Sequence, residues 1–235
     1  MDSKLKFSFR DEYLLNKLNI KHNLPESMLL SWGSNDKNQT SHDGYNKLTF
    51  PRMIFKLKHI DVHSIKCGTE FNLCLSKEGK VYAWGNNTKG QCGIVSHTPT
   101  SKAKYNFTHK GGIIVNDPTV IKELINKHIT HISCGDEHAL ALDTTHNVYS
   151  WGNSEFGVLG YAVQQEYQTV PKEINYFSDN GIKINTITCG FVHNIATDDK
   201  GDLYGWGDNK AGQLGIGDDK RDYIVQPVHL LLSDN

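Results

Sequence analysis

The sequence lacks both a long apolar run and a strong excess of charge of either sign. No stretch of its 235 residues approaches the ~20 consecutive apolar residues of a membrane-spanning helix, and the opening MDSKLKFSFR lacks the apolar core of a secretory signal. A formal net charge of -1 gives no general attraction to nucleic acid or to an anionic membrane. We therefore expect an intracellular protein, cytoplasmic or nuclear, that neither spans a membrane nor binds nucleic acid directly.

The short motifs of common enzyme and metal sites are also missing. The sequence contains no G-x-x-x-x-G-K-[ST], no G-x-S-x-G and no H-E-x-x-H. Its five cysteines include no Cys-x-x-Cys pair of the kind that zinc sites use. Acidic residues such as Asp198 and Asp218 cluster at expected turns, where we interpret them as solvated loop charge. We expect no catalytic residue, no metal ion and no cofactor.

What the sequence does contain is a unit that recurs three times. CGTEFNLCLSKEGKVYAWGNNTKGQCG begins at Cys67, CGDEHALALDTTHNVYSWGNSEFGVLG at Cys134 and CGFVHNIATDDKGDLYGWGDNKAGQLG at Cys189. In each copy the Cys-Gly pair precedes a Trp-Gly pair by 17 residues (67 to 84, 134 to 151, 189 to 206), and glycines follow the Trp at +6 and +9. This constant spacing identifies a tandem repeat.

A fourth, weaker copy precedes these three. In LLSWGSNDKNQTS the pair Trp32-Gly33 remains, but Asn38 and Ser41 stand where the other units have glycines. No Cys-Gly pair precedes this Trp. A proline closes every unit, at Pro51, Pro118, Pro171 and Pro227. The chain therefore contains about four units, of which three are complete by signature.

Each unit predicts β-strands that are buried on both faces. In KVYAW, NVYSW and DLYGW, small or aliphatic residues alternate with Tyr and Trp, so neither face of the strand is polar. Stacked sheets explain this pattern, because the bulky Tyr/Trp face of one sheet can pack on the small face of the next. The turn sequences contain residues that tolerate positive φ, such as Gly79, Gly201 and the pair His146-Asn147.

These residues resemble the regulator of chromosome condensation repeat, whose units read roughly P…V…CG..H..AL…G.VY.WG.N..GQLG. The match runs from about Met28 to Val228. The resemblance implies an all-β fold, a β-propeller with one four-stranded blade per unit, here small or incomplete. We expect an N-terminal extension over residues 1–27 and a repeat domain over 28–235, with units around Trp32, Trp84, Trp151 and Trp206.

The missing half of the first unit leaves two interpretations of the N-terminal residues. Residues 1–31 could supply that half in degenerate form, since the Cys-Gly register falls on Leu15-Asn16. Alternatively, SFRDEYLLNKL forms a short helix that follows a strand. We favour the helix. A further unit after Pro227 would show its signature near residue 243, and the chain stops at Asn235.

The repeat also favours a structural role for the cysteines and histidines. Cys74 aligns with Ala141 and Cys92 with Leu159, as small core residues do, while the other three cysteines recur once per blade. We expect all five to be reduced and to resist a thiol reagent. His138 and His193 share one register, and we expect them to form hydrogen bonds between blades.

Departures from the repeat are the candidate binding residues. The segment between Gly93 and Pro118 has 24 residues where later units have 10 or 11, and it carries basic and aromatic residues: Lys102, Lys104, Tyr105, Phe107 and Lys110. We expect an exposed loop here, which is either a protein-binding element or a tolerated surface insertion. Between the repeat Gly and His lie Thr69-Glu70, Asp136-Glu137 and Phe191-Val192 in the three units, and we expect these pairs near the strand ends that crowd one rim of the propeller.

The founding member of the family is a guanine-nucleotide exchange factor for the small GTPase Ran. There, acidic residues in this register touch the GTPase and a protruding loop wedges toward the nucleotide site. The resemblance thus implies that Glu70, Asp136 and Glu137 contact a Ran-like or other small GTPase, with the 94–117 loop as the counterpart of the wedge. The chemistry would be at most nucleotide exchange. The alternative is a scaffold for protein interactions without activity on a GTPase.

Overall fold

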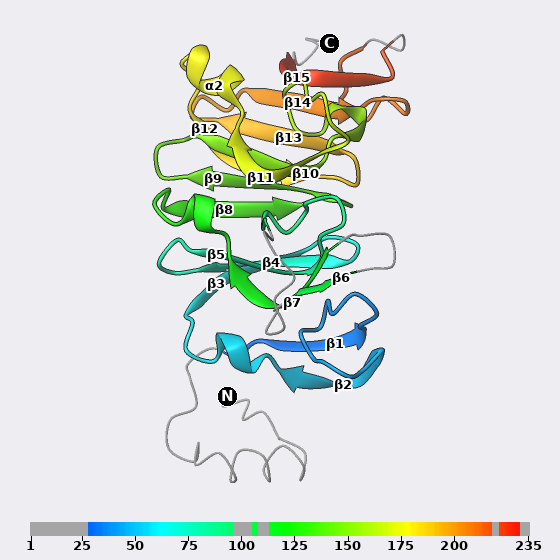
Figure 1. Ribbon diagram of the computed structural model, residues 1–235. Helices are drawn as coiled ribbons and strands as arrows, with labels where there is room; N and C mark the ends of the chain where they lie inside the picture. The colour runs from blue at the N-terminus through cyan, green and yellow to red at the C-terminus, as the bar shows by residue number, and fades with distance from the viewer. Residues whose placement is uncertain (1–27, 96–104, 108–112, 218–220, 231–235) are drawn as a thin grey trace, which may run out of the picture.

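The computed structural model describes residues 28–95, 105–107, 113–217 and 221–230, and in this part the chain forms four antiparallel sheets that follow one another in sequence order (Figure 1). The first sheet has two strands, β1 (Leu30–Ser34) and β2 (Lys47–Met53). The second, in spatial order, contains β3 (Val62–Cys67), β4 (Phe71–Ser76), β5 (Val81–Asn86), β7 (Ile113–Val120) and β6 (Tyr105–Phe107). The predicted N-terminal helix and strand lie outside the described residues.

The last two sheets have four strands each, in simple up-and-down order. One contains β8 (Ile129–Cys134), β9 (His138–Asp143), β10 (Val148–Asn153) and β11 (Tyr167–Glu173). The other contains β12 (Ile184–Cys189), β13 (His193–Asp198), β14 (Leu203–Asp208) and β15 (Tyr223–Leu230). The short helices η1 (Phe55–Leu57), η2 (Lys122–Leu124) and α2 (Asn175–Asp179) follow the last strand of a sheet, and η3 (Glu155–Gly157) follows β10. The predicted four-stranded blade is confirmed.

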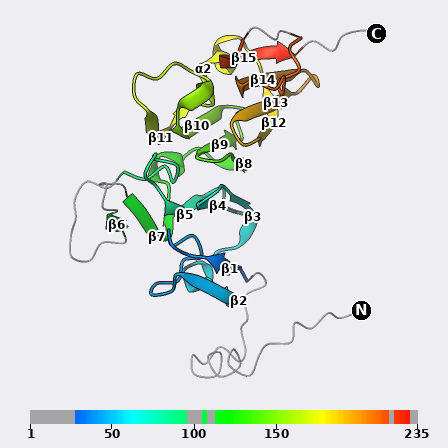
Figure 2. The same ribbon diagram turned by 90° about the vertical axis from the view of Figure 1, so that its right-hand side faces the viewer.

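The sheets stack face to face as predicted (Figures 1 and 2). The repeat tryptophans join them through hydrogen bonds. Trp84, Trp151 and Trp206 are buried, and each indole Nε1 donates a hydrogen bond of 2.9 Å to a backbone carbonyl of the preceding unit. The three acceptors are Gln39, Gln91 and Val158, each seven residues after the Trp of its own unit. The Trp therefore holds one blade to the loop of the blade before it.

The loops after Trp84 and Trp151 carry glycines because the next sheet packs directly on them. A Cβ on Gly90 would lie 2.6 Å from the Thr169 Cα, and the φ of Gly90 is +74°. In the first unit, Asn38 and Ser41 adopt the same left-handed conformation, with φ of 54° and 57°. Asparagine tolerates this region better than most residues, so the weak first unit keeps the loop geometry without the glycines.

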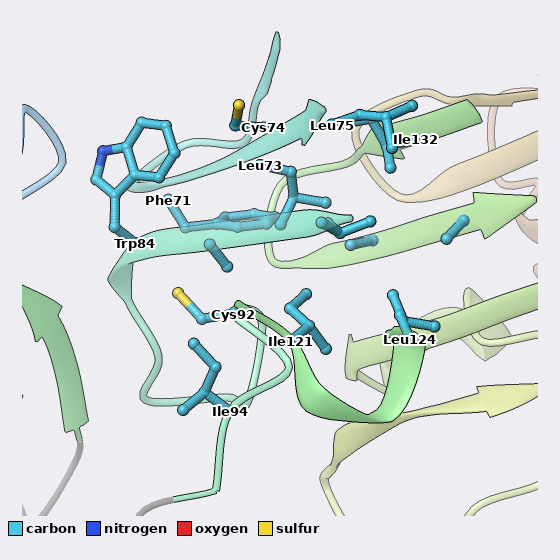
Figure 3. Packing of buried hydrophobic residues seen from close by; sticks show 14 of the residues in the cluster. Phe71, Leu73, Cys74, Leu75, Trp84, Cys92, Ile94, Ile121, Leu124 and Ile132 are labelled. Carbon is cyan, nitrogen blue, oxygen red and sulfur yellow. The ribbon is translucent and has the colours of Figure 1, made fainter. Parts of the chain in front are cut away.

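The core between the sheets is apolar and closely packed. Around the second sheet it includes Phe71, Leu73, Cys74, Trp84 and Cys92 (Figure 3). Cys74 and Cys92 have no exposed surface, which confirms that they are core residues. Burial raises the pKa of the Cys74 thiol to about 12 and that of Cys92 well above its ordinary value, so neither forms a thiolate near neutral pH.

Cys67 departs from this pattern. It is exposed, whereas Cys134 and Cys189 in the same register are half-buried. The exposure argues against the expectation that all five cysteines resist a thiol reagent. The physical reason is that each later hairpin packs beside the hairpin of the sheet before it, and the first sheet has no such hairpin among the described residues.

The predicted contact between blades is present for one of the two histidines. The Nε2 of His138 lies 2.8 Å from the Oδ1 of Asn194 in the next sheet, and burial lowers the pKa of His138 to about 4. His193 is half-buried in the last sheet, and the described residues provide no following sheet for its ring to contact.

Candidate functional site: the rim of Cys-Gly turns

The first two strands of each complete sheet form a hairpin, and the three hairpin turns lie at the same end of the stack. We call these hairpins (β3–β4, β8–β9 and β12–β13) the Cys-Gly hairpins, and their turns, residues 68–70, 135–137 and 190–192, the Cys-Gly rim. The N–H of Thr69 donates to the carbonyl of Asp136 at 3.2 Å, and the N–H of Asp136 donates to the carbonyl of Phe191 at 2.9 Å. The three turns thus form one hydrogen-bonded row across three sheets.

The acidic side chains of the rim are held in place by neighbouring amides. The Nδ2 of Asn86 donates to the Oε2 of Glu70 at 2.8 Å, and the Nδ2 of Asn153 donates to the Oε2 of Glu137 at 3.1 Å. The hydroxyl of Thr69 donates to the carboxylate of Asp136. Each of these carboxylates has a fixed position and is half-buried, with part of its surface in solvent.

The last turn keeps a carboxylate that the sequence pattern had hidden. Val192 stands in the register of Glu70 and Glu137, so the acidic pattern breaks at this position of the sequence. The residue opposite it on the Trp strand is Asp208, in the register of Asn86 and Asn153. The backbone hydrogen bond between the two positions is the same as in the other units, since the N–H of Asp208 donates to the carbonyl of Val192 at 2.8 Å. The Glu–Asn pair of the other two units is a Val–Asp pair in this unit. Aligning both positions of the pair across the three units would have shown from the sequence that this turn keeps a carboxylate.

The rim also exposes an aromatic side chain. Phe191 is 66% exposed, although its backbone carbonyl is fixed by Asp136. An exposed aromatic ring on a rigid backbone loses little conformational entropy when a partner covers it. The rim therefore combines acidic groups with one apolar contact point.

The long segment of the second unit is not a simple loop. It contains β6, which pairs with β7 through Tyr105↔Val115 and Phe107↔Ile113 and adds a fifth strand to the second sheet. In this register Asn86, beside Glu70, pairs with Ile114, which in turn pairs with Asn106. Two strand spacings separate Asn86 from Asn106, or about 10 Å. The segment of Tyr105 and Phe107 thus lies at the same end of the second sheet as Glu70, while Lys102, Lys104 and Lys110 lie outside the described residues.

Within the described residues, no group of three or more His, Cys, Asp or Glu side chains is arranged to hold a metal ion. In the same residues, no helix is long and apolar enough to cross a membrane.

Comparison with known proteins now identifies the repeat. The family model of the regulator of chromosome condensation (RCC1) repeat matches residues 78–142, 145–197 and 200–234, and a second model of this repeat matches 62–91, 129–158 and 184–213. The chain belongs to the RCC1 repeat family. The resemblance inferred from the sequence is confirmed.

Several proteins with different names are similar to this chain in sequence. The chain is 32% identical over 193 residues to the probable E3 ubiquitin-protein ligase HERC6 of Homo sapiens, covering 82% of this chain and 17% of that protein. It is 26% identical over 226 residues to human Protein RCC2, covering 87% and 40%. It is 31% identical over 188 residues to the ultraviolet-B receptor UVR8 of Arabidopsis thaliana, covering 80% and 39%. The chain spans less than half the length of each of these relatives.

Solved structures of RCC1-type propellers share the fold. Human WBSCR16 superimposes with a TM-score of 0.71 at 24% identity, covering 87% of this chain and 48% of that one. Prp20p from Saccharomyces cerevisiae, whose structure is described together with its binding to Gsp1p and histones, gives a TM-score of 0.71 at 24% identity, covering 88% and 47%. The predicted β-propeller architecture is confirmed, with the described sheets corresponding to part of such a propeller.

Proposed function

We propose that the Cys-Gly rim is a protein-binding surface whose partner is a small GTPase, Ran or a related one, and that binding promotes release of its nucleotide. The observation that carries this proposal is the hydrogen-bonded row from Thr69 through Asp136 to Phe191, which presents acids and an aromatic ring from three sheets on one rigid edge. Binding of Gsp1p and histones by Prp20p supports a protein partner, and the exchange factor for Ran that founded the family supports the choice of a GTPase.

Such an activity needs no bond chemistry in this chain. If the rim binds the nucleotide-free GTPase more tightly than the loaded form, reciprocal coupling lowers the affinity of the GTPase for its nucleotide by the same factor. A hundredfold preference corresponds to about 2.7 kcal/mol of coupling. The rigid row suits this task, because a surface that adapted equally well to both forms would produce no exchange.

The charge of the rim defines the partner surface. Glu70, Asp136, Glu137 and Asp208 favour a basic patch on the GTPase. Because Asp136 and Glu137 keep part of their surface in solvent, they accelerate association more than they strengthen the final complex. Association should therefore slow as ionic strength rises.

The long segment of the second unit adds a second contact of opposite charge. Lys102, Lys104 and Lys110, with Tyr105 and Phe107, belong to a segment whose strand β6 lies about two strands from the Glu70 end of the sheet. We assign these residues to the partner contact that displaces the nucleotide.

A panel of small GTPases loaded with fluorescent nucleotide tests the proposal. The chain should accelerate nucleotide release from at least one GTPase, and the double variant Asp136→Lys/Glu137→Lys should abolish this. The matched control is Asp199→Lys/Asp202→Lys, which makes the same charge change on two exposed residues at the opposite end of the last sheet. Equal rates for the two variants, at unchanged melting temperature, would show that the rim is not the site.

The second candidate is a scaffold that binds proteins without exchange activity. It is favoured by the range of similar proteins, which include a probable E3 ubiquitin-protein ligase and an ultraviolet-B receptor. Partners recovered from lysate with the wild-type chain and with both variants distinguish the two functions. Partners that depend on the rim and include no GTPase would replace the first candidate by the second.

A further inference from the structure

The loop after the Trp of the third unit departs from the other three. In the first, second and fourth units, an Asn and a Gln side chain hold this loop by accepting hydrogen bonds from its backbone N–H groups: Asn35 and Gln39, Asn87 and Gln91, Asn209 and Gln213. Ser154 and Val158 stand at these two positions in the third unit. The hydroxyl of Ser154 donates instead to the carbonyl of Gln165 at 2.9 Å. Loops that vary on a constant scaffold are where binding residues concentrate.

Phe156 lies in this loop in a backbone conformation that costs energy. Its φ is 57°, in the left-handed region that bulky side chains rarely adopt. Lys37, Lys89 and Ala211 stand at the same position of the other loops, and their φ is not positive. Strain of this kind persists where the surrounding structure fixes it, and it is common at binding sites. The aromatic ring is therefore a feature of the third unit alone.

The loop is joined to the rim on the side of the third sheet. The N–H of Glu155 donates to the Oδ1 of Asn153 at 3.2 Å, and the Nδ2 of Asn153 donates to the Oε2 of Glu137 at 3.1 Å. One amide group thus connects the residue before Phe156 to a rim carboxylate. Phe156 is half-buried, with part of its surface in solvent.

On the side of the fourth sheet, a cation of the chain itself covers the ring. The short helix η3, which contains Phe156, lies against β14 and β15. The Nζ of the exposed Lys210 lies 5.2 Å from the centroid of the Phe156 ring, a distance at which the ring attracts a positive charge. The N–H of Lys210 donates to the Oδ1 of Asp208 at 3.4 Å. The ring therefore lies between the loops that carry Glu137 and Asp208.

These two carboxylates can accept further hydrogen bonds. The Oε2 of Glu137 binds Asn153, and the Oδ2 of Asp208 accepts from Gln213 at 2.6 Å, but a carboxylate has about four lone-pair sites. Both groups are half-buried and keep part of their surface in solvent. An aromatic face flanked by two carboxylates suits a guanidinium group, which stacks on rings and directs its planar N–H groups to carboxylate oxygens.

We propose that Phe156 is the binding site for an arginine side chain of the protein partner, with Glu137 and Asp208 accepting hydrogen bonds from its guanidinium. This inference rests on the proposed function, because it names a side chain that the partner presents to the rim. In the free chain, Lys210 occupies the ring in place of that arginine. The partner displaces it, since a planar guanidinium stacks on a ring better than a compact, strongly hydrated ammonium group.

A fluorescein-labelled peptide of four arginines is the probe, and the same peptide with citrulline in place of arginine is its control. Citrulline has nearly the shape of arginine but no charge. Fluorescence anisotropy at physiological ionic strength should show the full chain binding the arginine peptide about tenfold more tightly. Equal binding of the two peptides would mean that the site takes no cation, and it would overturn the proposal.

Variants of the ring and of its covering cation should have effects of opposite sign. Phe156→Leu keeps an apolar side chain but removes the aromatic face, so it should weaken binding of the arginine peptide about fivefold. Phe156→Trp keeps the face and should bind at least as tightly as the wild-type chain. Lys210→Gln removes the competing cation and should strengthen binding. Its matched control is Lys89→Gln, which removes the same charge from the loop of the second unit and should have a clearly smaller effect.

Equal binding by Phe156→Leu and Phe156→Trp, or equal effects of Lys210→Gln and Lys89→Gln, would overturn the proposal. The peptide assay contains no GTPase, so its failure is distinct from failure of the proposed function. Selective binding of the arginine peptide without exchange on any GTPase would refute the exchange function alone. A rim partner that binds Phe156→Leu as tightly as the wild-type chain would refute the arginine site alone.

Discussion

At the scale of single residues, the same residue type has different roles according to its neighbours. Trp151 is fully buried and donates to the carbonyl of Gln91, while Trp32, at the same repeat position, is 61% exposed. His138 is buried against Asn194, while His193 has no following sheet in the described part of the chain. The repeat signature predicts the position of a side chain within its blade, and the adjacent blade decides whether that side chain is buried.

The two tryptophans give a matched stability test. Trp151→Ala should lower the free energy of unfolding by about 3–5 kcal/mol, because it leaves a cavity between two sheets. Trp32→Ala should cost less than about 1 kcal/mol, as expected for a largely exposed side chain. Denaturant unfolding followed by circular dichroism measures both. Similar costs for the two changes would contradict the assignment of Trp151 to the interface between blades.

His138 predicts a dependence of stability on pH. Its pKa is lowered to about 4 in the folded chain by burial, against an ordinary 6.5, so the unfolded chain binds a proton more readily. Its contribution is therefore fully present above pH 6.5 and is lost as the pH falls toward 4, by about 3 kcal/mol in total. His138→Gln should unfold with a shallower pH dependence over this range. Parallel curves for the two proteins would show that another group is responsible.

At the scale of the elements, the sequence predicted the strands and their burial because both follow from short-range patterns. The alternating segment NVYSW lies largely in β10, which is buried on both faces. In each complete unit, the segment from the Cys-Gly pair to the Trp spans parts of three paired strands. The strand β6 was expected to be loop, because its three residues carry no period and gain their structure only by pairing with β7. Asp208 was missed for a similar reason, since its relation to Val192 exists only across two paired strands.

Two glycines separate the effect of backbone conformation from that of packing. Gly157 and Gly212 have φ of +70° and +71°, but a Cβ on Gly157 would lie 2.7 Å from the Val225 Cα, while nothing lies within 4 Å of one on Gly212. Both changes to Ala incur the strain of a left-handed residue, and Gly157→Ala adds an overpacking cost of about 1–3 kcal/mol. Thermal unfolding of the two variants should therefore differ clearly. Equal melting temperatures would mean that the last sheet, which contains Val225, does not pack on the loop of Gly157.

At the scale of the whole molecule, the function we propose depends on three sheets acting as one surface. The rim contains Glu70 from the second sheet, Asp136 from the third and Phe191 from the fourth, and the hydrogen bonds of the turns connect them. The repeat register predicted that all three positions lie near the strand ends at one rim, but it could not predict the backbone hydrogen bonds that join one turn to the next. A partner that covers the row must contact all three sheets.

The affinity of one purified partner for single rim variants tests most directly whether the three turns form one binding surface. Glu70→Lys, Asp136→Lys and Phe191→Ala each change one turn, and Asp199→Lys changes an exposed acid at the other end of the last sheet. We predict that all three rim variants bind the partner at least fivefold more weakly than the wild-type chain, with melting temperatures within a few degrees, while Asp199→Lys binds as the wild type does. Loss of affinity in only one rim variant, or an equal loss in Asp199→Lys, would contradict a single binding surface across the three turns.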